Sequence, residues 1–297
     1  MRELEYQLCD VFTSKVLQGN QLAVFLSTVK LSDDRMQAIA REMNLSETTF
    51  VLRRDMNIER ARGVRVRIFT TREELPFAGH PTLGTAATIR HAYPEYADAD
   101  TIVLDLNAGP IPVRFPRDAA KTTAATFGEM MQLDPEFGAT HEARTIAPFL
   151  GLSADDIIER APQTVSTGMP FCIVVLRSLE ALARLQLNPA AGGEYLRGSD
   201  AKFFYVLAPE ESGTWRARMQ FYHGEDPATG SAAGCAISYL VRHRLWAAGA
   251  QLHIRQGIEI NRPSDLYASV NFADGKVCDV RVSGSTVPVA KGRLFLE

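Results

Sequence analysis

The sequence has few of the features that mark secreted, membrane-spanning or zinc-binding proteins. Its four cysteines, Cys9, Cys172, Cys235 and Cys278, are far apart and form no C-x-x-C pair, which excludes zinc-ribbon and thioredoxin signatures. No apolar run approaches the ~18 residues that a membrane span needs. The N-terminal segment MRELEYQLCDVF carries charges where a signal peptide has an apolar stretch. We therefore expect a cytoplasmic protein with buried, reduced thiols and no membrane partner.

The chain also lacks a strong charge bias and the common cofactor motifs. It has 32 basic and 35 acidic side chains and a net charge of -3, whereas a nucleic-acid-binding protein usually has a basic surplus. There is no G-x-x-x-x-G-K-[ST], G-x-G-x-x-G, G-x-S-x-G or H-E-x-x-H motif, so nucleotide, serine-hydrolase and zinc-protease signatures are absent. One alternative stays open, in which His223, Glu225 and Asp226 join His80 in a metal site.

The 297 residues, 46% of them hydrophobic, are enough for about two domains with a buried core. Alternating apolar patterns predict strands, and periodic ones predict helices. The expected helices are 32–44, 79–93, 178–185 and 229–246. The expected strands are 4–12, 22–26, 47–53, 64–70, 101–106, 111–115, 171–176, 202–208, 215–222, 252–257, 266–272, 276–282 and 287–296. The polar stretch 116–126 is the expected crossing between domains.

An imperfect repeat relates the two halves of the chain. FAGHPTLGTAATI (77–89) and DPATGSAAGCAIS (226–238) are both turns that lead into a helix of small residues. Such a repeat favours two similar lobes that face each other. The first N–H groups of a helix have no intrahelical partner and lie at its positive end, so each motif can bind a carboxylate or phosphate. Ordinary capping by Asp226, Thr229 or Ser231 is the alternative.

These motifs together resemble the phenazine-biosynthesis isomerase family, the PhzF-like proteins with a diaminopimelate-epimerase-type fold. The resemblance runs nearly end to end, and the pair ELPFAGHP (74–81) and EDPATGSA (225–232) is the most specific part of it. It implies an α+β fold of two pseudo-symmetric lobes, each a β-sheet wrapped around a central helix. The lobes would be 1–118, completed by the C-terminal strand 286–297, and 119–285. The family also implies a site between the lobes, a homodimer and no cofactor.

The resemblance assigns roles to single residues. Glu47, in NLSE, matches the family's catalytic acid/base, although a lone glutamate is usually a solvated surface residue. His80 and Asp226 join it in the catalytic set. The substrate-binding residues implied by the same motifs are Gly79, Gly230 and Ser231.

The wider fold includes racemases that use two opposed cysteines. In this chain those thiols would fall near Ala78 and Pro227, neither of which can take a proton. A single glutamate favours a proton shift over inversion at one carbon. We therefore expect a cofactor-independent isomerase that moves a proton between carbons of a small carboxylate, with trans-2,3-dihydro-3-hydroxyanthranilate as one substrate candidate. The alternatives are an amino-acid-type epimerase or racemase, with Asp226 as second base, and a non-catalytic dimer that binds small anions.

Two departures from the family pattern concern the region of the expected site. Gln21 stands where the family commonly has proline. The segment 218–231 is several residues shorter than usual before EDPATG, which bears on the identity of the substrate.

Overall fold

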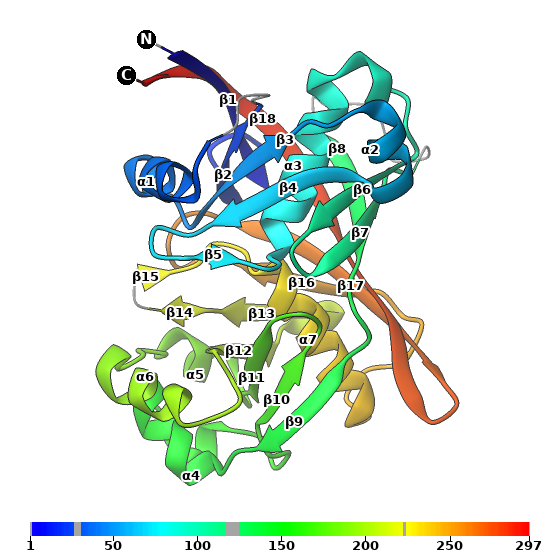
Figure 1. Ribbon diagram of the computed structural model, residues 1–297. Coiled ribbons are helices and arrows are strands. Elements are labelled where there is room, and N and C mark those ends of the chain that lie inside the picture. The colour runs from blue at the N-terminus through cyan, green and yellow to red at the C-terminus, as the bar shows by residue number, and fades with distance from the viewer. Residues whose placement is uncertain (1, 27–30, 117–124, 222–223, 297) are drawn as a thin grey trace. The chain divides into compact units, whose positions relative to one another are not determined.

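A computed structural model describes residues 2–26, 31–116, 125–221 and 224–296 (Figure 1). It is a mixed α/β fold with a closed, barrel-like sheet. This confirms the expectation that the chain combines helices with β-sheets. The chain divides into two compact units, Met1–Met131 with Ser283–Glu297, and Gln132–Val282. Most of the expected crossing at 116–126 lies outside the described residues.

The first unit consists mainly of strands. Its strands are β1 (Arg2–Val11), β2 (Asn20–Phe25), β3 (Glu47–Leu52), β4 (Val64–Phe69), β5 (Glu74–Leu75), β6 (Thr101–Leu106), β7 (Gly109–Arg114), β8 (Thr126–Met131) and the C-terminal part of β18 (Lys276–Leu296). Its helices are α1 (Asp33–Met43), α2 (Met56–Arg62), α3 (Gly79–Ala92) and a 3₁₀ turn at Pro94–Tyr96. The sheet order is β1-β2-β3-β4-β6-β7-β8-β18, and β18 also pairs with β1, so these strands close into a ring.

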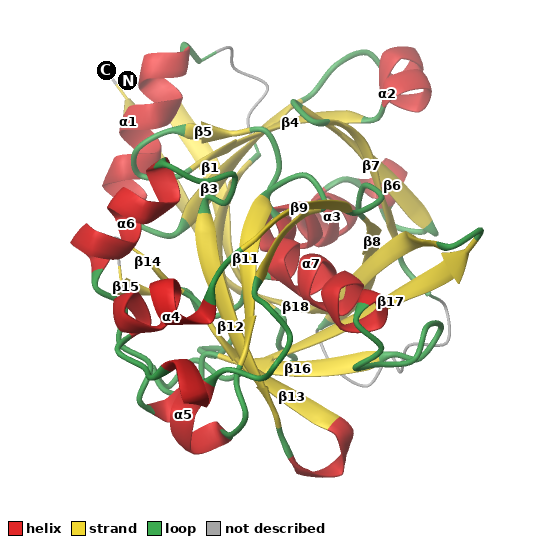
Figure 2. Cartoon of the chain, turned by 90° about the horizontal axis from the view of Figure 1, so that it is seen from below, coloured by secondary structure: helices red, strands yellow, loops and turns green. Residues whose placement is uncertain are grey.

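The helix α3 packs inside the first unit because its side chains are small. It contacts β1, β2, β3, β6, β7 and β8 (Figure 2). A Cβ atom on Gly84 would lie 2.6 Å from Leu22 Cδ2 and 2.7 Å from Val11 Cγ2, distances that real Cβ atoms do not show. Thr85 Oγ1 on the helix hydrogen-bonds Thr49 Oγ1 on β3 at 2.8 Å. These contacts fix the middle of α3 against β1, β2 and β3.

The helix α1 begins and ends as its sequence predicts. The Ser32 side chain accepts a hydrogen bond from Arg35 N at 3.3 Å and caps the N-terminus, while Asn44 ends the helix in the left-handed conformation with φ 51°. Met36, Ile39 and Ala40 are buried against the sheet. This helix connects β2 to its parallel neighbour β3, and so it sets where β3 begins.

The second unit has the same kinds of element. Its strands are β9 (Glu136–Thr140), β10 (Gln163–Ser166), β11 (Pro170–Val175), β12 (Phe203–Pro209), β13 (Thr214–Arg218), β14 (Gln220–Phe221), β15 (Gly224–Glu225), β16 (Leu252–Gln256), β17 (Ser264–Ala273) and the first part of β18. Its helices are α4 (Ala143–Ile146), α5 (Leu179–Ala183), α6 (Pro189–Arg197), α7 (Gly230–Arg242) and 3₁₀ turns at Ala147–Leu150, Ala154–Asp156 and Glu211–Gly213. The sheet order is β9-β10-β11-β12-β13-β16-β17-β18, with β14 and β15 as a separate pair.

The two units share one order of strand pairing. In the first, β2–β3 is parallel, β3–β4 antiparallel, β4–β6 parallel and β6–β7 antiparallel. In the second, β11–β12 is parallel, β12–β13 antiparallel, β13–β16 parallel and β16–β17 antiparallel. The helices α3 and α7 occupy equivalent places, since each lies on the connection between the second pair of parallel strands. The two similar sequence motifs therefore begin structurally equivalent helices.

The structure differs from the expected elements in several places. The expected strands 276–282 and 287–296 form one continuous strand, β18. The expected helix 229–246 ends at Arg242, because Arg244 takes a left-handed φ of 58°. The expected strand 215–222 is divided into β13 and β14. Three helices, α2, α4 and α6, and the strands β5, β8, β9, β10 and β15 were not expected from the sequence.

Candidate functional site

Glu47 and His80, which the sequence places 33 positions apart, lie together in the first unit. Glu47 begins β3, opposite Leu22 of β2, and His80 is in the first turn of α3. Glu47 Oε2 is 3.5 Å from His80 Nε2, and their side chains are 16% and 4% exposed. Glu47 is therefore not the solvated surface glutamate that is usual for this residue type: its side chain is largely buried, and its Oε2 atom is buried completely.

Burial determines the charge of His80. It lowers the pKa of this imidazole from 6.5 to about 3, although the backbone of Gln21 acts in the opposite direction. The ring is thus neutral at physiological pH, and its contact with Glu47 is not an ion pair. Asn20 Nδ2 lies 3.1 Å from His80 Nδ1. With this amide donating, the histidine has its proton on Nε2, the nitrogen that faces Glu47.

The start of α3 leaves backbone donors available. Its N-cap residue, Ala78, makes no side-chain hydrogen bond to the helix. The first intrahelical bond joins Thr82 N to Ala78 O at 3.3 Å. Pro81 has no N–H, so the donors of this turn that have no partner within the helix are the N–H groups of Gly79 and His80, both of which are buried residues. The first unit therefore combines one carboxylate, one neutral imidazole and two backbone donors.

Asp226 and the start of α7 form a second polar cluster, in the second unit. Thr229 Oγ1 donates to Asp226 Oδ2 at 2.6 Å, and both residues are 7% exposed. Because its hydroxyl is used in this way, Thr229 makes no side-chain cap on α7, contrary to the capping alternative for this residue. The first intrahelical bond runs from Ala233 N to Thr229 O at 3.0 Å. The N–H groups of Gly230 and Ser231 precede it at the positive end of the helix.

Gln256, at the end of β16, holds this second cluster in place, a role that we had not assigned from the sequence. Its side chain is fully buried. Its Nε2 donates to Asp226 O at 2.8 Å and to Thr229 Oγ1 at 2.9 Å. Its Oε1 accepts from Thr229 N and Tyr205 OH, both at 3.1 Å. The alternating pattern of LHIRQ places this glutamine on the buried face, which is the only sequence signal for it.

The next residue, Gly257, allows the β16 end to approach the Asp226 segment closely. It has a φ of +76°, and a Cβ atom there would lie 2.6 Å from Pro227 O and would also strike Arg262 O. On the other side of the helix start, Gln132 Nε2 donates to Gly230 O at 3.0 Å, and Thr167 Oγ1 donates to Gln132 Oε1 at 2.6 Å. Side-chain amides thus hold both sides of this turn.

Other ligand types find less support in the described residues. Within 2–26, 31–116, 125–221 and 224–296, no group of three His, Cys, Asp or Glu side chains could hold a metal ion. His223, of the metal-site alternative, lies outside these ranges. All four cysteines are free, and burial raises the pKa of Cys9 and of Cys235 to about 12. No helix among the described residues is long and apolar enough to cross a membrane.

The comparisons with known sequences all point to one protein family. Residues 9–292 match the family described as phenazine biosynthesis-like protein, PhzC-PhzF. The chain is 38% identical, over 98% of its length and 99% of the relative's, to trans-2,3-dihydro-3-hydroxyanthranilate isomerase of Pseudomonas aeruginosa. It is 34% identical, over the same shares, to the enzyme of that name from Pseudomonas chlororaphis.

Solved structures agree on the fold. A predicted epimerase from Pseudomonas aeruginosa matches with a TM-score of 0.83 and 37% identity, covering 99% of this chain and all of that one. A probable proline racemase from Agrobacterium radiobacter matches with a TM-score of 0.70, covering 99% of this chain and 93% of that one. Its identity is only 9%, so this second likeness concerns the fold alone.

Proposed function

The chain belongs to the family of phenazine biosynthesis-like proteins and is an isomerase, and on this basis we propose that Glu47 is its general acid and base. In this proposal Glu47 removes a proton from one carbon of a small carboxylate substrate and returns it to another carbon. No cofactor takes part. The observation that carries the proposal is the pairing of the largely buried Glu47 carboxylate with a neutral imidazole 3.5 Å away.

The surroundings of Glu47 suit proton transfer to and from carbon. Carbon acids are weak, so a base acts on them best when water is largely excluded from its carboxylate. The neutral His80 does not neutralise Glu47 by forming an ion pair, and its Nε2 can donate a hydrogen bond to the substrate or to Glu47. A positioned base of this kind contributes roughly 10²–10⁴-fold to the rate.

The helix N-termini supply anion binding in this proposal. The N–H groups of Gly230 and Ser231 at α7 would hold the substrate carboxylate, as backbone donors at the positive end of a helix commonly do. Gly79 would offer a further backbone donor. Asp226, held by Thr229 and Gln256, would accept a hydrogen bond from a hydroxyl or amino group of the substrate.

The substrate class follows from the relatives. Two relatives, at 38% and 34% identity, are named trans-2,3-dihydro-3-hydroxyanthranilate isomerase, and we propose a ring carboxylate of that class as the substrate. The two thiols of a racemase would fall near Ala78 and Pro227, neither of which can take a proton, and this favours the single-base proton shift over racemisation.

The same proposal extends to the architecture of the chain. We regard the two units as the two pseudo-symmetric lobes of the family's fold, because they share one order of strand pairing and equivalent helices α3 and α7. The lobe boundaries given from the sequence, the homodimer and the cytoplasmic location rest on the family resemblance and the sequence.

The test is incubation of the protein with a panel of small carboxylates in D₂O, followed by NMR. The proposal expects one ring carboxylate to be converted to a positional isomer. The product should contain deuterium at the carbon that receives the proton, to the extent that Glu47 exchanges with solvent during turnover. Exchange of a single stereocentre, with inversion and no shift of double bonds, would show an epimerase instead. Binding without isotope uptake or product, for every acid of the panel, would favour an anion-binding protein.

A further inference from the structure

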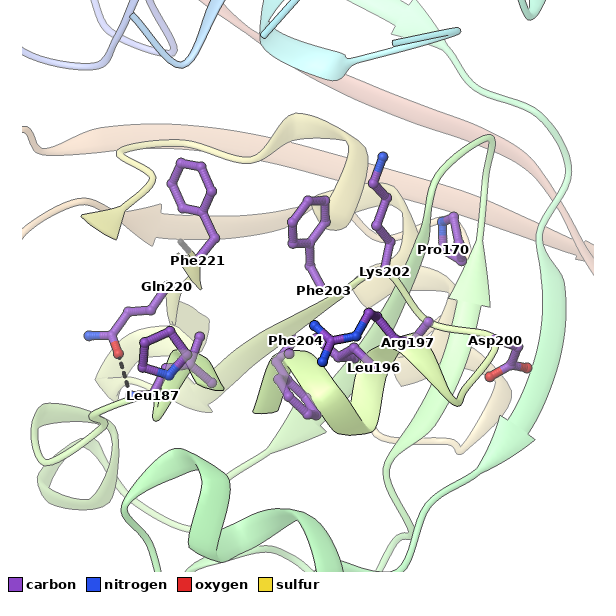
Figure 3. A pocket seen from close by; sticks show the side chains of 13 residues that line it. Pro170, Leu187, Leu196, Arg197, Asp200, Lys202, Phe203, Phe204, Gln220 and Phe221 are labelled. Carbon is purple, nitrogen blue, oxygen red and sulfur yellow. Dashed lines mark hydrogen bonds between the residues drawn. The ribbon is translucent and has the colours of Figure 1, made fainter. Parts of the chain in front are cut away.

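A cavity in the second unit lies among residues that the proposed reaction does not use. Its volume is about 390 Å³, and it lies among α6, the start of β11, the start of β12 and β14 (Figure 3). This volume is near the lower end of the roughly 300–1,000 Å³ of small-molecule sites. None of its lining residues belongs to the AGHP or DPATGS motif. The residues that line it are Pro170, Leu187, Pro189, Gly193, Leu196, Arg197, Asp200, Ala201, Lys202, Phe203, Phe204, Gln220 and Phe221.

The walls of the cavity suit a flat ring. Phe203 and Phe221 meet edge to face, with ring centroids 6.4 Å apart and planes at 90°, and Figure 3 shows both rings directed into the same space. Proline and leucine side chains make up much of the remaining wall. Aromatic rings favour stacked or edge-to-face contact with another ring, which adds to the benefit of burying apolar area.

The polar groups of the cavity favour a negative charge. The Arg197 guanidinium makes no hydrogen bond or ion pair within the described chain, and it is exposed at the cavity. Lys202 adds a second cation, with its Nζ 5.9 Å from the Phe203 ring centroid. Gln220 is already used, since its Oε1 accepts from Leu187 N at 2.7 Å. A guanidinium binds a carboxylate through two parallel hydrogen bonds.

The one acidic residue of the lining does not oppose this assignment. Asp200 Oδ1 accepts from Thr164 Oγ1 at 2.6 Å, and its Oδ2 accepts from Ala139 N at 2.8 Å. Both oxygens are therefore bound to donors outside the cavity lining. Figure 3 shows this carboxylate directed away from the two phenylalanine rings.

We propose that this cavity is a second ligand site, for a flat aromatic carboxylate of one or two rings. The ring lies against Phe203 and Phe221, and the carboxylate pairs with Arg197, with Lys202 close to it. The assignment is independent of the proposed reaction, because it uses neither Glu47 nor the starts of α3 and α7.

The test uses 2-naphthoate as the probe and the full-length protein. Binding is measured by calorimetry and by the shifts of amide NMR resonances, and 2-naphthalenemethanol serves as the neutral counterpart of the probe. We expect saturable binding, with the largest shifts in residues 193–204 and 220–221. Arg197→Gln should weaken naphthoate about tenfold, equivalent to ~1.4 kcal/mol, and should leave the affinity for the neutral alcohol unchanged. Turnover of the substrate should stay at the wild-type level.

Two further variants make the outcome decisive. Arg144→Gln alters another exposed arginine of the second unit, outside the cavity lining, and should not change naphthoate binding. Phe203→Leu keeps the wall apolar but removes the ring, and should weaken both probes about two- to tenfold. The proposal is wrong if naphthoate shows no saturable binding below about 1 mM, if Arg197→Gln binds it as well as Arg144→Gln does, or if the shifts centre on residues 79–80 or 230–231.

Discussion

Gln256→Leu should separate the role of this glutamine in the second cluster from its role in stability. The substitution keeps the buried volume approximately constant but removes all four hydrogen bonds of the amide, to Asp226 O, to both the N–H and the hydroxyl of Thr229, and to Tyr205 OH. Each such bond contributes about 0.5–1.5 kcal/mol net, so the free energy of unfolding should fall by roughly 2–6 kcal/mol. That is a large share of the ~5–15 kcal/mol of a typical protein.

A control variant distinguishes local disorder of the cluster from general loss of stability. Gln163 is also a buried strand glutamine of the second unit, and its amide bonds Gly138 O and His243 Nε2, both at 3.1 Å. Gln163→Leu should therefore destabilise the protein without loosening the Asp226–Thr229 turn. Urea unfolding followed by circular dichroism gives the two stabilities, and steady-state kinetics is measured where both variants are folded.

The expected difference lies in substrate binding. Without Gln256 the Thr229 N–H and hydroxyl lose their partner, so the start of α7 and the Asp226 carboxylate are no longer held in one geometry. KM should rise at least tenfold above that of Gln163→Leu, which corresponds to ~1.4 kcal/mol of binding. If the two variants have the same KM, or if Gln256→Leu is as stable as the wild type, Gln256 does not position this cluster.

Three further predictions follow from the site. Because burial lowers the pKa of His80 from 6.5 to about 3, the unfolded state binds more protons between these values. The free energy of unfolding should therefore show no dependence on His80 protonation above pH 6.5 and should fall by up to ~1.4 kcal/mol per pH unit below it. In urea unfolding, His80→Asn should lack this fall, and a pH profile equal to that of the wild type would contradict the prediction. Activity should survive dialysis against EDTA, because the proposed mechanism uses no metal, and a loss of activity that added metal restores would point to a metal site. Activity should also survive thiol alkylation near neutral pH, because burial raises the pKa of Cys9 and Cys235 to about 12. Gly230→Val should weaken substrate binding more than tenfold, or ~1.4 kcal/mol, with a native circular dichroism spectrum, and unchanged affinity in a titration would remove the α7 N-terminus from the site.

Capping residues and apolar periodicity in the sequence predicted several helices and strands correctly. Ser32 with two following aspartates predicted the start of α1, and the alternation of VRVRIF predicted β4. The small-residue motifs predicted helices from positions 79 and 229, and α3 and α7 begin at Gly79 and Gly230.

Features that depend on tertiary contacts were not predictable in the same way. The sequence of α6 contains two adjacent glycines, which have low helix propensity. It still forms a helix because Asn188 caps it, Pro189 stands in the first turn, where proline is favoured, and Gly192 is buried. Gln256 is 30 positions from Asp226 and lies on β16, whereas Asp226 lies between β15 and α7, so no local pattern predicts their contact. The approach of Glu47 to His80 likewise depends on how β3 and α3 pack.

The central claim, that Glu47 moves the proton, is tested most directly by Glu47→Gln. Glutamine keeps the size and most of the hydrogen bonding of glutamate but cannot accept a proton from carbon. Turnover should fall by at least ~10²-fold, substrate affinity should change little, and deuterium uptake from D₂O into substrate and product should stop together with turnover. Glu42→Gln, an exposed glutamate on α1, should behave as the wild type. Deuterium exchange by Glu47→Gln near the wild-type rate would contradict the account, and Asp226 or His80 would then be the next residue to test as the base.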